Sequence, residues 1–155
     1  MNKTELYRQW LREEDAARMQ GWDFSHLRGR YEEEQDLPWD YEQAVRTFLR
    51  PDKELLDMDT GGGEFLLSLG HPCNKTSAIE GWPPNADLCR HRLIPLGIRF
   101  QQADGGGPLP FADGAFDLIL NRHGSYDPAE VCRLLRPGGM FITEQVGAQN
   151  DRELV

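Results

Sequence analysis

Residues 55–67 constrain the fold of this chain more than any other stretch. Residues 55–58 form a short apolar run that contains one acid, Asp57, and such a run is typical of a buried parallel strand. Three consecutive glycines follow at positions 61–63, and they permit a tight turn because glycine adopts positive φ without steric cost. Glu64 then favours a helix start, where a carboxylate faces the positive end of the helix dipole. Strand, turn and helix together predict a cradle whose free backbone N–H groups face a ligand.

The spacing of the glycines separates two classes of cofactor. The dinucleotide fingerprint requires the pattern G-x-G-x-x-G. Gly61 and Gly63 match its first two glycines, but Leu66 occupies the third position. This mismatch weighs against an NAD-dependent oxidoreductase, which remains one alternative.

Four further β-prone segments alternate with helical segments along the chain. Helices are expected after the glycine turn, over about residues 85–94, and from Pro128, because proline suits the first turn of a helix. Such alternation predicts an α/β fold with a doubly wound sheet of about five parallel strands and right-handed crossovers. The later strands are expected at residues 76–80, 98–104, 116–121 and 140–146.

Polar residues mark the carboxyl ends of these strands. In an open α/β sheet, ligands bind beyond those ends, at the point where the strand order reverses. Glu80 lies about as far beyond the glycine turn as a ribose-binding acid is expected. The whole set predicts one ligand site at this edge of the sheet: Asp57, Asp59, Glu80, Asp104 and Asn121.

Residues 54–146 resemble class I S-adenosylmethionine-dependent methyltransferases. The resemblance is carried by an acid-x-G-x-G-x-G motif that begins at Asp57 and by four later segments in the family's order. These segments are residues 80–82, 103–104, 109–117 and 135–139. The resemblance implies a Rossmann-like sheet of strand order 3-2-1-4-5 and S-adenosyl-L-methionine as the cofactor. It also implies methyl transfer to a small molecule that the sequence does not identify.

The resemblance further implies a role for each residue that matches the family's motifs. The methionine part of the cofactor would be flanked by Thr60, Gly61 and Gly63, and the ribose would be held by Glu80. The adenosine would be lined by Gly81 and Trp82, and the adenine amino group would be bound by Asp104 beside Ala103. Asn121 would lie where cofactor and acceptor meet.

Aromatic side chains and one histidine extend this candidate site. The sulfonium of the cofactor is cationic, so Trp39 or Tyr41 could attract it through a cation–π contact. His123, beyond the fourth strand, could act as a base if the acceptor must first lose a proton. No metal-ligand cluster is expected, and no residue is assigned as catalytic.

The sequence departs from the family pattern in two places. Asp59 occupies the position of the first glycine of the motif, so its carboxylate should weaken cofactor binding unless it pairs with the cofactor's ammonium group. The family's sheet has seven strands, the last two forming a hairpin, and this 155-residue chain ends soon after its fifth expected strand. A shortened, non-catalytic module that binds the cofactor or a partner is therefore a second alternative.

Overall charge, hydropathy and cysteine usage indicate which partners and which cellular location to expect. A net charge of −9 argues against nucleic-acid binding, which requires a basic face. No apolar run reaches the roughly 18 residues of a membrane span, and the N-terminus is polar, so neither a span nor a signal peptide is expected. Three cysteines without a C-x-x-C pair fit a reducing, cytoplasmic location.

The chain is expected to divide into an N-terminal helical cap, residues 1–50, and a Rossmann-like cofactor-binding domain, residues 51–155. The cap would contain an amphipathic helix from Thr4, as its N-cap, to about Met19, and a second helix from Tyr41 to Leu49. Without the family's hairpin, the strand at residues 140–146 becomes an edge with unpaired backbone groups, which recruit partners. A homodimer closed through this edge is therefore expected.

Overall fold

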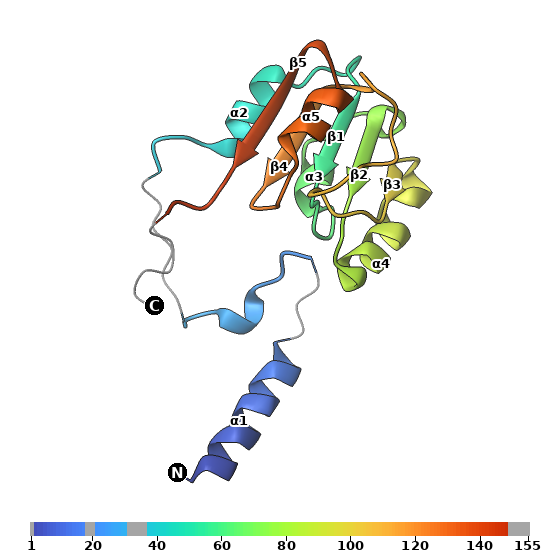
Figure 1. Ribbon diagram of the computed structural model, residues 1–155. Coiled ribbons are helices and arrows are strands. Elements are labelled where there is room, and N and C mark those ends of the chain that lie inside the picture. The colour runs from blue at the N-terminus through green and yellow to red at the C-terminus, as the bar shows by residue number, and fades with distance from the viewer. Residues whose placement is uncertain (1, 18–20, 31–36, 149–155) are drawn as a thin grey trace.

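The computed structural model describes residues 2–17, 21–30 and 37–148 (Figure 1). Helices and strands alternate along most of the chain, as predicted. The helices are α1 (Lys3–Ala16), α2 (Tyr41–Phe48), α3 (Glu64–Ser68), α4 (Pro83–Arg92) and α5 (Pro128–Leu134). The strands are β1 (Leu55–Met58), β2 (Thr76–Ile79), β3 (Arg99–Gln101), β4 (Phe116–Arg122) and β5 (Leu135–Glu144).

The five strands form one parallel sheet in the order β3-β2-β1-β4-β5 (Figure 1). This arrangement confirms the predicted α/β, Rossmann-like class and its strand order. β1 lies at the centre, with Leu55 opposite Thr76 of β2 on one side and Leu118 of β4 on the other. All four residues of β1 are buried, as expected for a strand flanked on both edges and covered on both faces. The chain order reverses between β2 and β4, so the switch point lies at the carboxyl end of β1.

Helices cover both faces of the sheet, and successive residues of β1 belong to different cores. Leu55 belongs to a cluster that includes Val45 of α2, Leu66 of α3 and Cys89 of α4. Leu56 belongs to a second cluster, formed with α5 and the loop that precedes β4. This alternation follows from the pleat of a strand, whose successive side chains point to opposite faces. α2 therefore packs within the main core as well as preceding the first strand.

β2 and β4 differ from the prediction by one residue each, whereas β3, which ends at Gln101 rather than at Asp104, and β5 differ by more. β3 begins at Arg99, because the Ile98 N–H closes the preceding turn onto the Leu93 carbonyl at 3.2 Å. β5 begins at Leu135, and its pairing with β4 shifts register between Phe116 and Leu118. The Pro137-Gly138 segment forms a bulge there, in which Gly138 has a φ of 80°.

Charged residues at the amino ends of the strands are paired. Glu54, just before β1, accepts from Lys75 at 2.6 Å and from Arg99 at 2.7 Å. Asp117 of β4 forms ion pairs with Lys53 and Arg136. These contacts link neighbouring strands at the edge of the sheet opposite the predicted ligand site.

α1 begins at Lys3, so its N-cap lies two residues earlier than predicted, and none of its residues is buried. Asn2, and not Thr4, is its N-cap: the Asn2 side chain accepts from the Glu5 N–H at 2.9 Å, and the Glu5 carboxylate accepts from the Asn2 N–H at 3.0 Å. This reciprocal capping box satisfies two backbone donors, whereas Thr4 lies inside the helix. Trp10 in this helix is 60% exposed, and α1 extends away from the sheet in Figure 1. The predicted helix end near Met19 lies outside the described residues.

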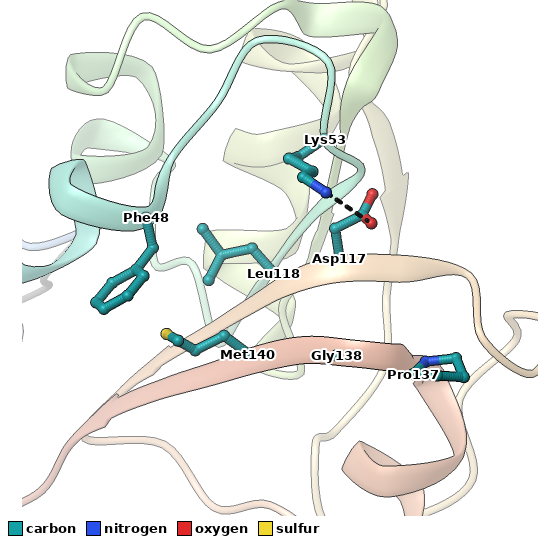
Figure 2. Close-up of a pocket in the computed structure, with 7 residues that line it drawn as sticks. All are labelled: Phe48, Lys53, Asp117, Leu118, Pro137, Gly138 and Met140. Atoms are coloured by element: carbon teal, nitrogen blue, oxygen red, sulfur yellow. Dashed lines mark ion pairs between the residues drawn. The ribbon is translucent and has the colours of Figure 1, made fainter.

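A hollow of about 160 Å³ lies between α2 and the amino half of β5 (Figure 2). Its polar wall is the ion pair between Lys53 and Asp117, whose charged atoms are 3.5 Å apart. Phe48 and Met140 face it and are 45% and 36% exposed.

Among the helices in the described ranges, none has the length and apolar character needed to cross a bilayer.

Candidate functional site at the carboxyl edge of the sheet

The glycine turn after β1 has the conformation that its sequence requires. Gly61 and Gly63 have φ values of 63° and 81°, in the left-handed region that favours glycine. The Gly63 N–H donates to the Thr60 carbonyl at 3.0 Å, and α3 begins at the next residue. The Cys89 thiol of α4 donates to the Gly61 carbonyl at 3.0 Å. The turn is therefore fixed both by its own backbone and by α4.

Glu80 joins this turn to the end of β2. One of its carboxylate oxygens accepts from the Gly61 N–H at 2.8 Å, and the other accepts from the Trp82 N–H at 2.8 Å. Each carboxylate oxygen has two acceptor sites, so each retains one for a further donor. Glu80 can therefore accept two ligand hydroxyl groups while it holds the turn in place.

Asp57 is buried beside the turn at the end of β1. Its carboxylate accepts from the Thr60 hydroxyl at 2.6 Å. Burial raises the pKa of Asp57 to about 7; the Thr60 hydrogen bond and the Arg122 cation oppose this, whereas Asp59 and Glu80 raise it further. Asp57 thus orients Thr60 and carries a carboxyl group that is only partly ionised near neutral pH.

Asp59 has a φ of 54°, a conformation that aspartate tolerates better than most residues. Burial, together with the charges of Glu80 and Asp104, raises the pKa of Asp59 to about 6. Its carboxylate lies against the loop after β4: a Cβ built on Gly124 would be 1.9 Å from Asp59 Oδ2. Gly124 therefore provides the space that the Asp59 side chain occupies.

The ends of β2 and β3 meet at the other side of the turn. A Cβ built on Gly81 would lie 3.4 Å from the Asp104 Cα, so the two backbones pass close together. The Ala103 N–H donates to the Glu80 carbonyl at 3.3 Å, and Asp104 accepts from the Gly106 N–H at 2.8 Å. Trp82 is 48% exposed at the start of α4. This corner offers a carboxylate and an accessible aromatic ring.

Asn121 lies at the end of β4, opposite Met58 in the register. Its side-chain oxygen accepts from the Gln145 amide at 2.6 Å and from the Thr143 hydroxyl at 3.3 Å. The Nδ2 atom of Asn121 has no hydrogen-bond partner. Among the described residues, it is the one buried side-chain nitrogen or oxygen that lacks a partner. A buried donor without a partner costs stability, so this group calls for an explanation, of which a bound ligand or water is one.

Two residues that the sequence analysis did not single out also lie at this edge. Trp22 lies over the glycine turn: a Cβ built on Gly61 would be 2.5 Å from its Nε1 atom. The Arg122 guanidinium carbon lies 5.4 Å from the Trp22 ring centre, 5.9 Å from that of Tyr41 and 4.9 Å from that of Phe65. The aromatic run around residue 22 was visible in the sequence, but no spacing rule connects it to the glycine turn.

The other predicted aromatic and histidine positions are now placed. Tyr41 faces Arg122, and its hydroxyl donates to the carbonyls of Asn121 and Ile142. Trp39 donates to Glu144 at 3.2 Å and is 57% exposed. His123 contacts the edge of Trp22, with ring centres 6.1 Å apart.

Replacement of Asp57 by Asn tests the electrostatics of this edge. An unfolded aspartate titrates near roughly pH 3.9, whereas burial raises the folded pKa of Asp57 to about 7. Between these values the folded chain holds a proton that the unfolded chain has released, so the free energy of unfolding falls as pH rises. Denaturant titrations at about pH 5 and 7.5 should show a smaller fall for Asp57→Asn than for the wild type.

Asp117→Asn is the matched control for this measurement. The pKa of Asp117 is lowered, chiefly by its hydrogen bond from the Glu54 N–H and by Arg136 against the effect of burial, so it titrates below this pH range. The control should keep the wild-type pH dependence. If the free energy of unfolding fell equally with pH in the wild type and in Asp57→Asn, the raised pKa of Asp57 would be contradicted.

With this geometry established, comparison with known proteins identifies the family. The model of the family described as "Methyltransferase domain" matches residues 56–143. The demethylmenaquinone methyltransferase of Thermus thermophilus is 31% identical over 118 residues, which is 69% of this chain and 53% of that protein. The fatty-acid O-methyltransferase of Mycolicibacterium smegmatis is 37% identical over 92 residues, covering 53% of this chain and 32% of that protein. The chain thus spans about half the length, or less, of such curated relatives.

Solved structures agree with the fold. A putative S-adenosyl-L-methionine-dependent methyltransferase from Methanococcus maripaludis has a TM-score of 0.56 at 18% identity, over 68% of this chain and 53% of that one. The geranyl diphosphate C-methyltransferase of Streptomyces coelicolor, solved with S-adenosyl-L-homocysteine, has a TM-score of 0.53 at 20% identity. The match covers 66% of this chain and 41% of that one. The family match covers more than half of the chain and includes the glycine turn, so this chain belongs to the methyltransferase-domain family, and the solved structures share its Rossmann-like fold.

Proposed function

We propose that this chain binds S-adenosyl-L-methionine at the carboxyl edge of its sheet and transfers the methyl group to a small-molecule acceptor. The observation that carries the proposal is the Glu80 carboxylate, held by the N–H groups of Gly61 and Trp82 with one acceptor site free on each oxygen. A vicinal pair of ribose hydroxyl groups suits that arrangement. Family membership and the methyltransferase relatives support the same cofactor.

The other residues of the edge fit the remaining parts of this cofactor. Glu80 would hold the ribose, with Gly81 and the exposed ring of Trp82 along the adenosine. Asp104, beside Ala103, would accept from the adenine amino group. The methionine part would lie by Thr60, Gly61 and Gly63, near Asp57, and the orphan donor of Asn121 would face the region where cofactor and acceptor meet. The described acids also favour a ligand with a cationic sulfonium.

Methyl transfer makes few chemical demands on the protein. The sulfonium supplies an activated methyl group, and the protein mainly aligns donor and acceptor, which can contribute roughly 7–11 kcal/mol. A base is needed only for an acceptor that must lose a proton, and His123 would be within the loop that borders the site. Of the expected N-terminal cap, residues 1–50, we propose that the part around Trp22 covers this edge, since Trp22 lies over the glycine turn, whereas α1 extends away from the sheet. Three free thiols are consistent with a reducing, cytoplasmic setting.

Two alternative functions remain: a titration tests the NAD-dependent enzyme, whereas the non-catalytic module differs from the proposal only in turnover. In a non-catalytic module, cofactor binding would occur without turnover. In an NAD-dependent enzyme, the third fingerprint glycine would allow α3 to approach the sheet closely, yet Leu66 fills that position and is buried in the core. Calorimetry with S-adenosylmethionine, S-adenosylhomocysteine and NADH should show binding of the first two ligands alone. Binding of NADH alone would overturn the proposal.

Glu80→Gln should weaken S-adenosylhomocysteine binding about tenfold to a hundredfold, because a charged acceptor of the ribose hydroxyls is lost, at roughly 1.5–3 kcal/mol. The variant retains the side-chain volume and one acceptor for the turn. Isothermal titration calorimetry measures the change, and thermal unfolding shows whether the variant is folded. Glu54→Gln, which alters an ion-paired acid at the opposite edge, should bind as the wild type does. Equal affinity of Glu80→Gln and the wild type would remove Glu80 from the site.

Asp59→Gly should tighten S-adenosylmethionine binding. The substitution removes a carboxylate that repels the carboxylate of the cofactor, and glycine adopts the positive φ of this position readily. The gain should be larger at low salt, where repulsion between charges is screened less. Calorimetry at two salt concentrations checks both statements. Weaker binding by the glycine variant would instead assign Asp59 as a partner of the cofactor's ammonium group.

We also propose that the chain forms a homodimer through the edge of β5. Among the described residues no strand pairs with the outer side of β5, and unpaired edges recruit partners. The hollow beside this strand adds apolar surface from Phe48 and Met140 (Figure 2). A two-fold axis would place a second copy against both features.

Light scattering on a sizing column should therefore report roughly twice the 17.7 kDa of one chain. Met140→Lys should shift the protein toward the monomer, because a charge replaces an exposed apolar contact. Met140 is preferable to Ile142, which packs against the core. Leu96→Lys is the matched control, since Leu96 is 51% exposed and lies beside β3 rather than β5. A wild-type monomer at high micromolar concentration would contradict the dimer.

A further inference from the structure

Arg122 is the one arginine of residues 37–148 whose side chain forms neither an ion pair nor a hydrogen bond with a described residue. The other arginines of this range all donate to carboxylates, to a side-chain amide or to carbonyl oxygens: Arg46, Arg50, Arg90, Arg92, Arg99, Arg133 and Arg136. A guanidinium carries five N–H donors and usually uses several of them. The donors of Arg122 are therefore available to a ligand.

The position of this cation is fixed by aromatic rings. Trp22 from the N-terminal segment, Tyr41 from α2 and Phe65 from α3 lie with their ring centres 4.9–5.9 Å from the guanidinium carbon. Such rings attract a cation through their quadrupole but provide no hydrogen-bond acceptor comparable to a carboxylate. The single Tyr41 hydroxyl proton is shared between the carbonyls of Asn121 and Ile142, and no hydrogen bond joins this hydroxyl to Arg122. The three rings thus hold Arg122 in place without an ion pair to a described residue, although the cation is close enough to Asp57 to lower the pKa of that carboxyl group.

The location of Arg122 connects this cation to the glycine turn. Arg122 follows Asn121 at the end of β4, Phe65 follows the turn by two residues, and Trp22 lies over Gly61. Asp57 is close enough to Arg122 to be influenced by its charge, and Asp59, Glu80 and Asp104 are the further carboxyl groups of this edge. A ligand carboxylate at the turn would be repelled by all four and attracted by Arg122. Arginine suits this contact, because its planar fork matches both oxygens of a carboxylate.

We propose that Arg122 receives the carboxylate at the amino-acid end of the cofactor. This inference rests on the proposed function, since it requires S-adenosylmethionine or its demethylated product to bind at the glycine turn. The cofactor combines a cationic sulfonium with a carboxylate, so a site of acids alone would suit only part of it. The aromatic box around Arg122 supplies the missing positive charge beside the turn.

The test compares two ligands that differ only in the carboxylate: S-adenosylhomocysteine and its decarboxylated analogue. Arg122→Met should weaken binding of S-adenosylhomocysteine roughly tenfold to a hundredfold, as expected when a hydrogen-bonded charge partner is lost. Binding of the decarboxylated analogue should stay within a factor of about two. Arg122→Lys, which retains the charge without the planar fork, should show an intermediate loss for S-adenosylhomocysteine alone. Calorimetry gives all these affinities.

Several outcomes would overturn the inference. Equal losses for both ligands would mean that Arg122 supports the fold of the site rather than the carboxylate. Unchanged S-adenosylhomocysteine binding in Arg122→Met would leave Arg122 to the acid of a methyl acceptor. Arg99→Met, an arginine at the amino end of β3, should bind both ligands as the wild type does, and thermal unfolding of each variant reports its folding. Failure of the wild type to bind S-adenosylhomocysteine would refute the proposed function itself, which separates the two claims.

Discussion

The paired hydrogen bonds from Gly61 and Trp82 to the Glu80 carboxylate organise the carboxyl edge of the sheet. They connect the turn after β1, through the Gly61 N–H, with the first residues after β2, through the Trp82 N–H. Because Glu80 is nearly buried, its charge is stabilised mainly by these backbone donors rather than by water. The conformation of the glycine turn and the orientation of the corner at residues 80–82 both depend on this one side chain.

The charged residues at the amino edge of the sheet are paired, whereas those at the carboxyl edge are buried close to one another. At the amino edge, Glu54 and Asp117 are each shared by two cations, an arrangement that links strands. At the carboxyl edge, burial and mutual repulsion raise the pKa of Asp57 and Asp59, and Asn121 keeps an unsatisfied donor. Such features reduce stability, and proteins commonly retain them where a ligand compensates for them. This contrast locates the candidate site independently of sequence similarity.

The sequence predicted those parts of the site that depend on local backbone chemistry. The glycine turn, the central buried strand and the acid after β2 follow from residue type and spacing, and each has the expected place. The N-cap of α1 and the start of β5 were less well predicted, because a capping box at Asn2 and a bulge at Gly138 are decided by geometry over a few residues. Trp22 and Arg122 were not predicted, since their contact joins segments that are distant in sequence and no periodic pattern relates them.

Amide NMR shifts during titration with S-adenosylhomocysteine test the central claim, that the carboxyl edge is the cofactor site, most directly. At 17.7 kDa the chain suits two-dimensional spectra in which each backbone N–H reports its own surroundings. The account predicts large shifts at Gly61, Gly63, Trp82 and Asp104, and none at Lys53 or Gly138, which line the hollow at the opposite edge. Shifts confined to that hollow, or none at millimolar ligand, would contradict it.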